Sequence, residues 1–97
     1  MTLLNATEMR ANLQSISDWK LEGREIVRTF VFPDFVTALQ FVNEVGKYAE
    51  AGQHHPDIDI RYNKVRLALT SHDAGGLTEK DFKLAVSCDS IGNALSR

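Results

Sequence analysis

The sequence predicts an α+β domain: a four-stranded antiparallel sheet with helices packed on one face, in the order α-β-β-α-β-β-α. Two observations predict this fold class. Hydrophobic residues recur at helical spacing in three segments, and two pairs of segments between them alternate hydrophobic with polar residues. Short connections within each pair are typical of antiparallel hairpins. The 97 residues contain no linker or repeat, so we expect residues 1–97 to form a single domain.

Each helix has a start signal. Asn5 and Glu8 have the spacing of a capping box. Asp34 can cap the second helix, and Gly52 is expected to stop it. Thr78 supplies a hydroxyl cap for the third helix. The expected helices cover residues 6–14, 35–50 and 79–95.

The strands form two hairpins. Gly23 makes the turn of the first hairpin. Asn63 and Lys64 are expected to make the second turn, because Asn favours the left-handed backbone that tight hairpins need. The expected strands cover residues 18–22, 25–32, 57–62 and 65–70. Such a sheet has open edges, which proteins protect or pair, so we expect a second copy of the chain to continue it.

Composition argues against several classes of protein. A net charge of −2 gives no basic face for nucleic acid. No apolar run approaches the ~18 residues of a membrane span, and the first residues do not resemble a signal peptide. The single cysteine, Cys88, allows no disulfide framework, which fits a reducing compartment. We therefore expect a cytoplasmic protein that binds neither nucleic acid nor membranes.

All three histidines fall in two short segments. His54 and His55 follow the central helix, and His72 lies just beyond the fourth strand. The second hairpin places the start of its first strand beside the end of its second, so the two segments should meet at one end of the sheet. Histidine exchanges protons near neutrality, with an unperturbed pKa of about 6.5. The three side chains could form an acid–base site, or each could be an ordinary exposed loop residue.

Other kinds of site have weaker support. No His-x-x-x-His pair occurs on a helix, and adjacent histidines in extended backbone point to opposite sides, which disfavours zinc. Cys88 falls on an apolar helix face and no Gly-x-Ser-x-Gly motif occurs, which disfavours a nucleophile. Glu50 could orient a histidine, and Asp81 could cap the last helix or act at the site. The residues favour proton transfer by histidine, without a metal or a cofactor.

One spaced pattern spans both histidine segments. It runs Glu50-x-x-x-His54-His55-Pro56, then five residues to Tyr62, nine residues to His72 and eight residues to Asp81. This pattern resembles the signature of the pterin-4a-carbinolamine dehydratases. The intervening sequence is similar to the family too, notably Thr70-Ser71-His72-Asp73 and the run from Gly76 to Phe82. The resemblance covers nearly the whole chain.

The resemblance implies an enzyme that removes water from a 4a-hydroxytetrahydropterin to give the quinonoid dihydropterin. The particular enzyme that the resemblance implies is 4a-hydroxytetrahydrobiopterin dehydratase, which acts in tetrahydropterin recycling. His54 is then the main acid–base group, His55 and His72 share the proton transfer, and Glu50 and Asp81 are supporting candidates. The residues implied to contact the pterin are Gln53, His54 and His55 on one side and Thr70, Ser71 and His72 on the other.

The resemblance also implies partners. It predicts a homodimer or homotetramer and a functional link to an aromatic amino-acid hydroxylase, which generates the carbinolamine. Two alternatives stay open. One is a non-catalytic dimerisation or coactivator-type protein of the same fold. The other is a dehydratase of a different pterin. The signature relates to the chemistry by which the hydroxyl leaves more than to the identity of the side chain on the pterin.

Overall fold

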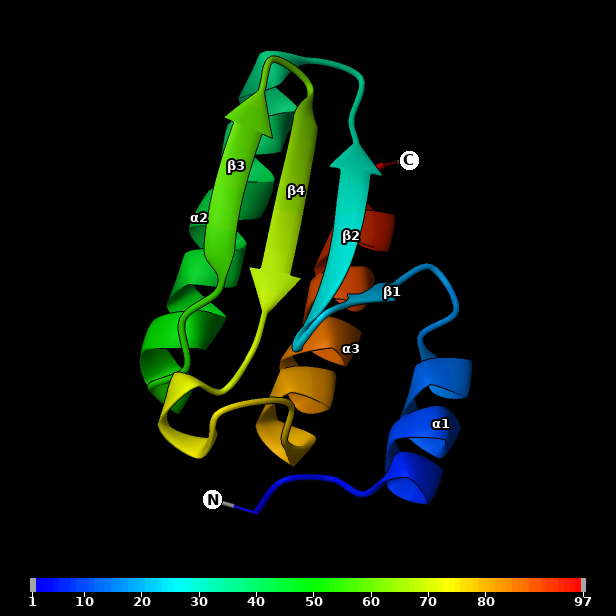
Figure 1. Cartoon of the computed structure of the whole chain (residues 1–97). Helices are drawn as coiled ribbons and strands as arrows, with labels where there is room; N and C mark the ends of the chain where they lie inside the picture. Colours follow the sequence, from blue (N-terminus) through cyan, green and yellow to red (C-terminus); the bar gives the residue numbers. More distant parts are fainter. Residues whose placement is uncertain (1, 97) are drawn as a thin grey trace.

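The computed structural model describes residues 2–96 and has the predicted element order (Figure 1). The helices are α1 (Ala6–Ser15), α2 (Phe35–Gly52) and α3 (Glu79–Leu95). The strands are β1 (Lys20–Glu22), β2 (Glu25–Val31), β3 (Asp57–Arg61) and β4 (Lys64–Leu69), and a short 3-10 helix, η1 (His72–Ala74), follows β4. Within residues 2–96, none of the helices combines the length and the apolar character needed to cross a membrane.

The strands form one antiparallel sheet in the order β1-β2-β4-β3. The two hairpins join through β2 and β4, whose register sets Ile26 opposite Leu69 and Phe30 opposite Val65. Strands β1 and β3 are therefore the edges of the sheet. The predicted fold class and sheet are confirmed.

Helices α2 and α3 cover one face of the sheet (Figure 1). The rings of Phe30 in β2 and Phe41 in α2 meet with their centroids 4.6 Å apart. Gly92 lets α3 approach this cluster, because a Cβ at that position would lie 2.8 Å from the Phe30 ring. The buried residues between sheet and helices include Ile26, Phe30, Ala38, Phe41, Val45, Val65, Leu67, Leu69, Phe82, Ala85 and Cys88.

The turn between β3 and β4 differs from its prediction. Arg61 pairs with Lys64, so the turn residues are Tyr62 and Asn63. The left-handed residue is Tyr62, with φ 54°. Asn63 instead donates from its side chain to the Phe32 carbonyl at 2.9 Å and accepts the Phe32 N–H at its own carbonyl at 2.9 Å. These hydrogen bonds to Phe32, just beyond β2, hold Asn63 in place. The preference of Asn for the left-handed conformation therefore does not decide the turn.

Candidate active site

The end of α2 positions the histidine pair. The helix stops at Gly52, as expected, but the left-handed residue that ends it is Gln53, with φ 50°. The side-chain amide of Gln53 donates to the Glu50 carbonyl at 2.8 Å. The backbone N–H of His54 donates to the Ala49 carbonyl at 3.0 Å. These bonds fold the chain back against the helix end, so His54 starts from a fixed backbone position.

Asp81 holds the side chain of His54. Oδ1 of Asp81 lies 2.5 Å from Nε2 of His54, and the exposed fractions of these side chains are 0% and 13%. Oδ2 accepts the Ser71 hydroxyl at 2.8 Å and the backbone N–H of Thr78 at 2.9 Å. The Ser71 and Thr78 hydroxyl oxygens lie 2.7 Å apart. Asp81 therefore caps α3, which is one of the two roles predicted for it, and it also contacts a candidate catalytic histidine.

This network determines which ring nitrogen of His54 is left for a ligand. Against an ionised Asp81, which could only accept hydrogen bonds, His54 would donate Nε2–H. Nδ1 is then the nitrogen that can give or take a proton. A buried carboxylate in this position also stabilises the ring when it becomes positively charged. The pair has the arrangement of an oriented acid–base group.

His55 has a different environment from His54. Its Nε2 lies 2.8 Å from Oε2 of Glu50, and the exposed fractions of the two side chains are 58% and 74%. Glu50 thus contacts a histidine, as the sequence suggested it could, and that histidine is His55. Water surrounds a contact this exposed, so it adds little to stability. His55 remains able to turn toward a ligand.

His72 begins η1, directly after the end of β4, and its side chain is exposed. Its loop is closed by a backbone bridge between Ser71 and Gly76 and by Gly75, whose φ of 76° suits glycine. The hydrogen bond from Ser71 to Asp81 ties this loop to the His54 segment. The two histidine segments therefore meet at one end of the sheet. Within the described chain, no hydrogen bond joins the His72 side chain to another histidine.

The other expected pterin contacts already have internal partners. The Thr70 hydroxyl donates to the Arg24 carbonyl at 2.7 Å. The side chain of Gln53 is held on its own helix, and Ser71 is buried against Asp81. In this structure these side chains fix the backbone of the two segments.

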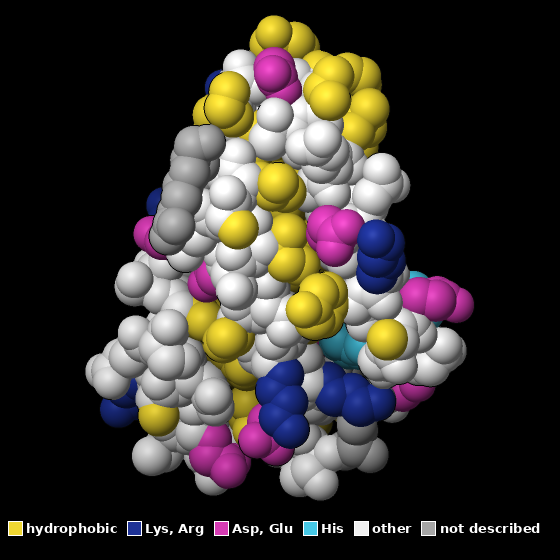
Figure 2. Space-filling model, turned by 180° about the vertical axis from the view of Figure 1, so that it is seen from behind, with side chains coloured by type: hydrophobic (Ala, Val, Ile, Leu, Met, Phe, Trp, Pro, Cys, Tyr) yellow, Lys and Arg dark blue, Asp and Glu magenta, His cyan; other side chains and the backbone are white. Residues whose placement is uncertain are grey.

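A cavity of about 310 Å³ opens beside His54, between the end of α2 and the first half of α3. We call it the lysine cavity. It is lined by Tyr48, Gly52, His54, Lys80, Lys83, Leu84 and Ser87. Figure 2 shows this face of the molecule, with histidine recessed among hydrophobic side chains and Lys and Arg side chains close by. The sequence predicts no role for the two lysines, whose i, i+3 spacing is the only signal that they share a helix face.

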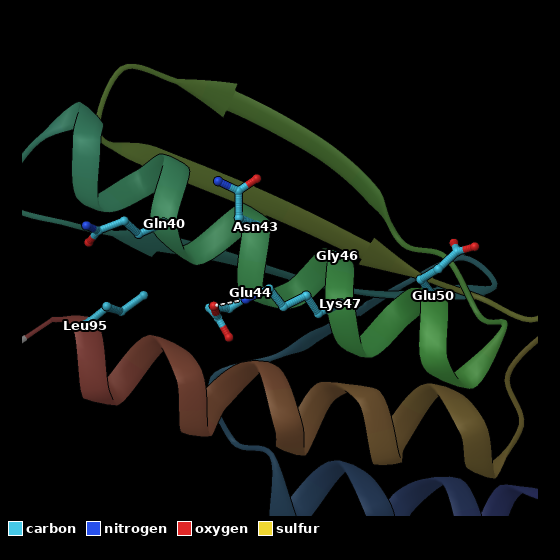
Figure 3. Close-up of a pocket in the computed structure, with 7 residues that line it drawn as sticks. All are labelled: Gln40, Asn43, Glu44, Gly46, Lys47, Glu50 and Leu95. Atoms are coloured by element: carbon cyan, nitrogen blue, oxygen red, sulfur yellow. Dashed lines mark hydrogen bonds and ion pairs between the residues drawn. The ribbon is translucent and has the colours of Figure 1, made fainter.

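A larger and more open hollow runs along α2 and contains no histidine. It is lined by Gln40, Asn43, Glu44, Gly46, Lys47, Glu50 and Leu95 (Figure 3). Glu44 and Lys47 form an ion pair there at 2.9 Å, and Glu50 points to the side of α2 away from α3. The lysine cavity is the better candidate for chemistry, because a held histidine lines it.

Cys88 is a core residue. Its side chain is fully buried, and burial, followed by the negative charge of Asp89, raises the pKa of its thiol to about 12. A thiol with this pKa is not a nucleophile at neutral pH. Among residues 2–96, no three His, Cys, Asp or Glu side chains are grouped so that they could hold a metal ion.

Comparison with known proteins gives the family. The family described as pterin 4 alpha carbinolamine dehydratase matches residues 2–91. The chain belongs to the pterin-4a-carbinolamine dehydratase family. A protein of Chloroflexus aurantiacus with that provisional name is 58% identical over 91 residues, which are 94% of this chain and 98% of that protein. A similarly named protein of Acidobacterium capsulatum is 54% identical over 94% of this chain and 99% of its own length.

Solved structures agree with the family fold. The crystal structure of a transcriptional coactivator/pterin dehydratase from Brucella melitensis has a TM-score of 0.90 and 36% identity, over 94% of this chain and 99% of that chain. A pterin dehydratase-like protein described as a RuBisCO assembly factor of the alpha-carboxysome has a TM-score of 0.67 and 19% identity, over 77% of this chain and 89% of that chain. The second likeness concerns the fold alone.

Proposed function

We propose that this protein dehydrates a 4a-hydroxytetrahydropterin to the quinonoid dihydropterin, with His54 as the main acid–base group. The observation that carries the proposal is the contact between Nε2 of His54 and the buried carboxylate of Asp81. This contact leaves Nδ1 of His54 available to a substrate. His54 also lines the lysine cavity. Family membership supports the reaction class.

The proposed reaction needs two proton movements. The C4a–O bond breaks as the hydroxyl takes a proton and leaves as water. A ring nitrogen loses a proton, and its electron pair forms the new C=N bond. The balance is the loss of water with no electron acceptor, so the step requires no redox cofactor. A positioned histidine can carry out either transfer, each contributing ~10²–10⁴-fold in rate.

We place the pterin ring between the segments 53–55 and 70–72. The Asp81 network supports this placement, because it joins the two segments. His55 and His72 have exposed side chains that can turn toward a bound ring, and we assign them to ring placement and secondary proton transfer. Glu50 would then orient His55.

The source of the substrate follows from its chemistry. A hydroxylase that oxidises a tetrahydropterin would supply the carbinolamine, and we propose an aromatic amino-acid hydroxylase in this role. The biopterin carbinolamine is one candidate substrate. The acid–base groups act at C4a and a ring nitrogen, so they do not by themselves select the side chain on C6.

We also propose that two copies of the chain pair along β3. Every residue of this edge strand is exposed, and the exposed fractions of Ile58 and Ile60 are 39% and 36%. Apolar side chains on an open edge invite pairing with another strand, and a second copy would bury them. A non-catalytic oligomerising role is the alternative function. It would use the same edge and would not require His54.

Stopped-flow absorbance with synthetic 4a-hydroxytetrahydropterin tests the proposed reaction. We expect the wild-type protein to remove the carbinolamine much faster than buffer alone, with the same rate after treatment with a strong chelator. Dehydration at the buffer rate would refute the enzyme proposal and favour the oligomerising role. Loss of activity on chelation would refute the metal-free mechanism.

A further inference from the structure

We propose that the lysine cavity binds an anionic group, of the phosphate type, carried on the side chain of the pterin. Lys80 and Lys83 would contact the anion while His54 acts on the ring. This inference rests on the proposed function and narrows it. It favours a pterin with a negatively charged side chain over biopterin, whose side chain is neutral.

The charge of the lysine cavity supports an anionic ligand. Its lining includes Lys80 and Lys83 and no Asp or Glu. Among residues 2–96, neither lysine forms an ion pair. Unpaired cations around one cavity are notable in a chain whose net charge is −2. An incoming anion would find both charges available.

The position of the lysines in α3 also favours binding of an anion. Lys80 lies in the first turn of a 17-residue helix, where the helix dipole is positive, and Lys83 lies in the second turn. Their i, i+3 spacing places them on one helix face. Across the cavity, the hydroxyl of Tyr48, on α2, can donate a hydrogen bond to an anion. The cavity therefore combines two cations with a neutral donor from a second helix.

The same cavity connects the anion site to the reacting atoms. His54 lines it, and His54 is the proposed acid–base group at C4a. In the pterin ring, C4a is joined through N5 to C6, and C6 carries the side chain. A pterin with C4a at His54 therefore has its side chain starting beside this residue. The chain has only to extend into the cavity to reach the lysines.

The size of the cavity fits this occupant. Its volume of about 310 Å³ is at the lower end of the range for small-molecule pockets, about 300–1,000 Å³. Leu84 contributes an apolar wall, and its exposed fraction is only 8%. A short carbon chain that ends in a phosphate matches a cavity with an apolar wall and cationic groups.

Equilibrium binding tests the inference without requiring turnover. The probes are dihydroneopterin, dihydroneopterin monophosphate and inorganic phosphate, measured by calorimetry with the wild type, with K80Q/K83Q and with K20Q. Lys20 is an exposed lysine of β1 that does not line the cavity, so K20Q is a control for the loss of a surface lysine outside the cavity. Circular dichroism confirms that each variant is folded.

We expect the wild type and K20Q to bind the monophosphate at least about tenfold more tightly than dihydroneopterin. K80Q/K83Q should lose this preference and keep its affinity for dihydroneopterin. Equal affinity for the two pterins in the wild type would overturn the inference. So would phosphate binding that depends on the lysines without any preference between the pterins, because the anion site would then be separate from the pterin site. The stopped-flow assay tests the proposed dehydration independently of these binding results.

Discussion

Nε2 of His54 and Oδ1 of Asp81 lie 2.5 Å apart although 27 positions separate them in the sequence. The contact joins the segment after α2 to the first turn of α3. Because Asp81 also accepts from Ser71 and Thr78, one buried carboxylate organises the helix start, the loop after β4 and the candidate acid–base group. The proposed catalysis therefore depends on how α3 docks.

Asp81→Asn should reduce kcat by about 10–100-fold. The amide has nearly the same shape but cannot stabilise a positively charged His54, and hydrogen bonds to charged groups are worth about 1.5–3 kcal/mol. We expect the pH profile of kcat to change as well, which a purely structural role would not cause. Asp73→Asn, in the exposed loop beside His72, is the matched control. A folded Asp81→Asn protein with the wild-type kcat and pH profile would refute this role.

Cys88 should resist alkylation in the native protein. Burial raises the pKa of its thiol to about 12, so the reactive thiolate is scarce below that pH and the sulfur is shielded from reagent. Iodoacetamide at pH 8 should label Cys88 only after denaturant unfolds the chain, as followed by mass spectrometry. Labelling of the folded protein at the rate of a free thiol would contradict the assignment of Cys88 to the core.

Gly92→Ala and Gly46→Ala should change stability in opposite directions. A Cβ on Gly92 would lie 2.8 Å from the Phe30 ring, and overpacking of this kind costs about 1–3 kcal/mol. Gly46, in α2, has no neighbouring atom within 4 Å of such a Cβ, so its substitution should stabilise the helix by up to about 1 kcal/mol. Urea denaturation measures both free energies of unfolding. If both variants were stabilised, the close packing of α3 on β2 would be wrong.

Ile60→Lys should separate the proposed dimer. The new charge would sit on the open edge of β3, where a second copy would otherwise bury Ile60. Light scattering should give twice the chain mass for the wild type and the chain mass for this variant. Asp59→Asn, on the solvated face of the same strand, should stay dimeric. A wild type that is monomeric at all concentrations tested would rule out pairing along β3.

The fold could be predicted because its signals are local. The apolar spacing of α2, the Asp34 cap and the alternation in each strand are properties of short segments. The pairing of β3 with β4 brings both histidine segments to one end of the sheet, as predicted. The side chain of Asp34 accepts from the Thr37 N–H at 2.8 Å, and hydrogen bonds from Thr37 lower the pKa of the Asp34 carboxyl.

The features that the sequence predicted wrongly or did not predict depend on tertiary contacts. Asn63 does not take the left-handed conformation because Phe32 holds it through hydrogen bonds. The choice of His54 as the partner of Asp81 depends on where α3 docks, which no short segment encodes. The lysine cavity has the same origin, since α2 and α3 form its walls together.

The rate of carbinolamine loss catalysed by His54→Ala decides whether His54 is the main acid–base group. Stopped-flow measurements would compare it with the wild type, His55→Ala and His72→Ala at one pH and one protein concentration. We predict a loss of about 10²–10⁴-fold for His54→Ala and smaller losses for the other two variants. A His54→Ala protein that dehydrates the pterin at the wild-type rate would contradict the assignment of His54 as the main acid–base group.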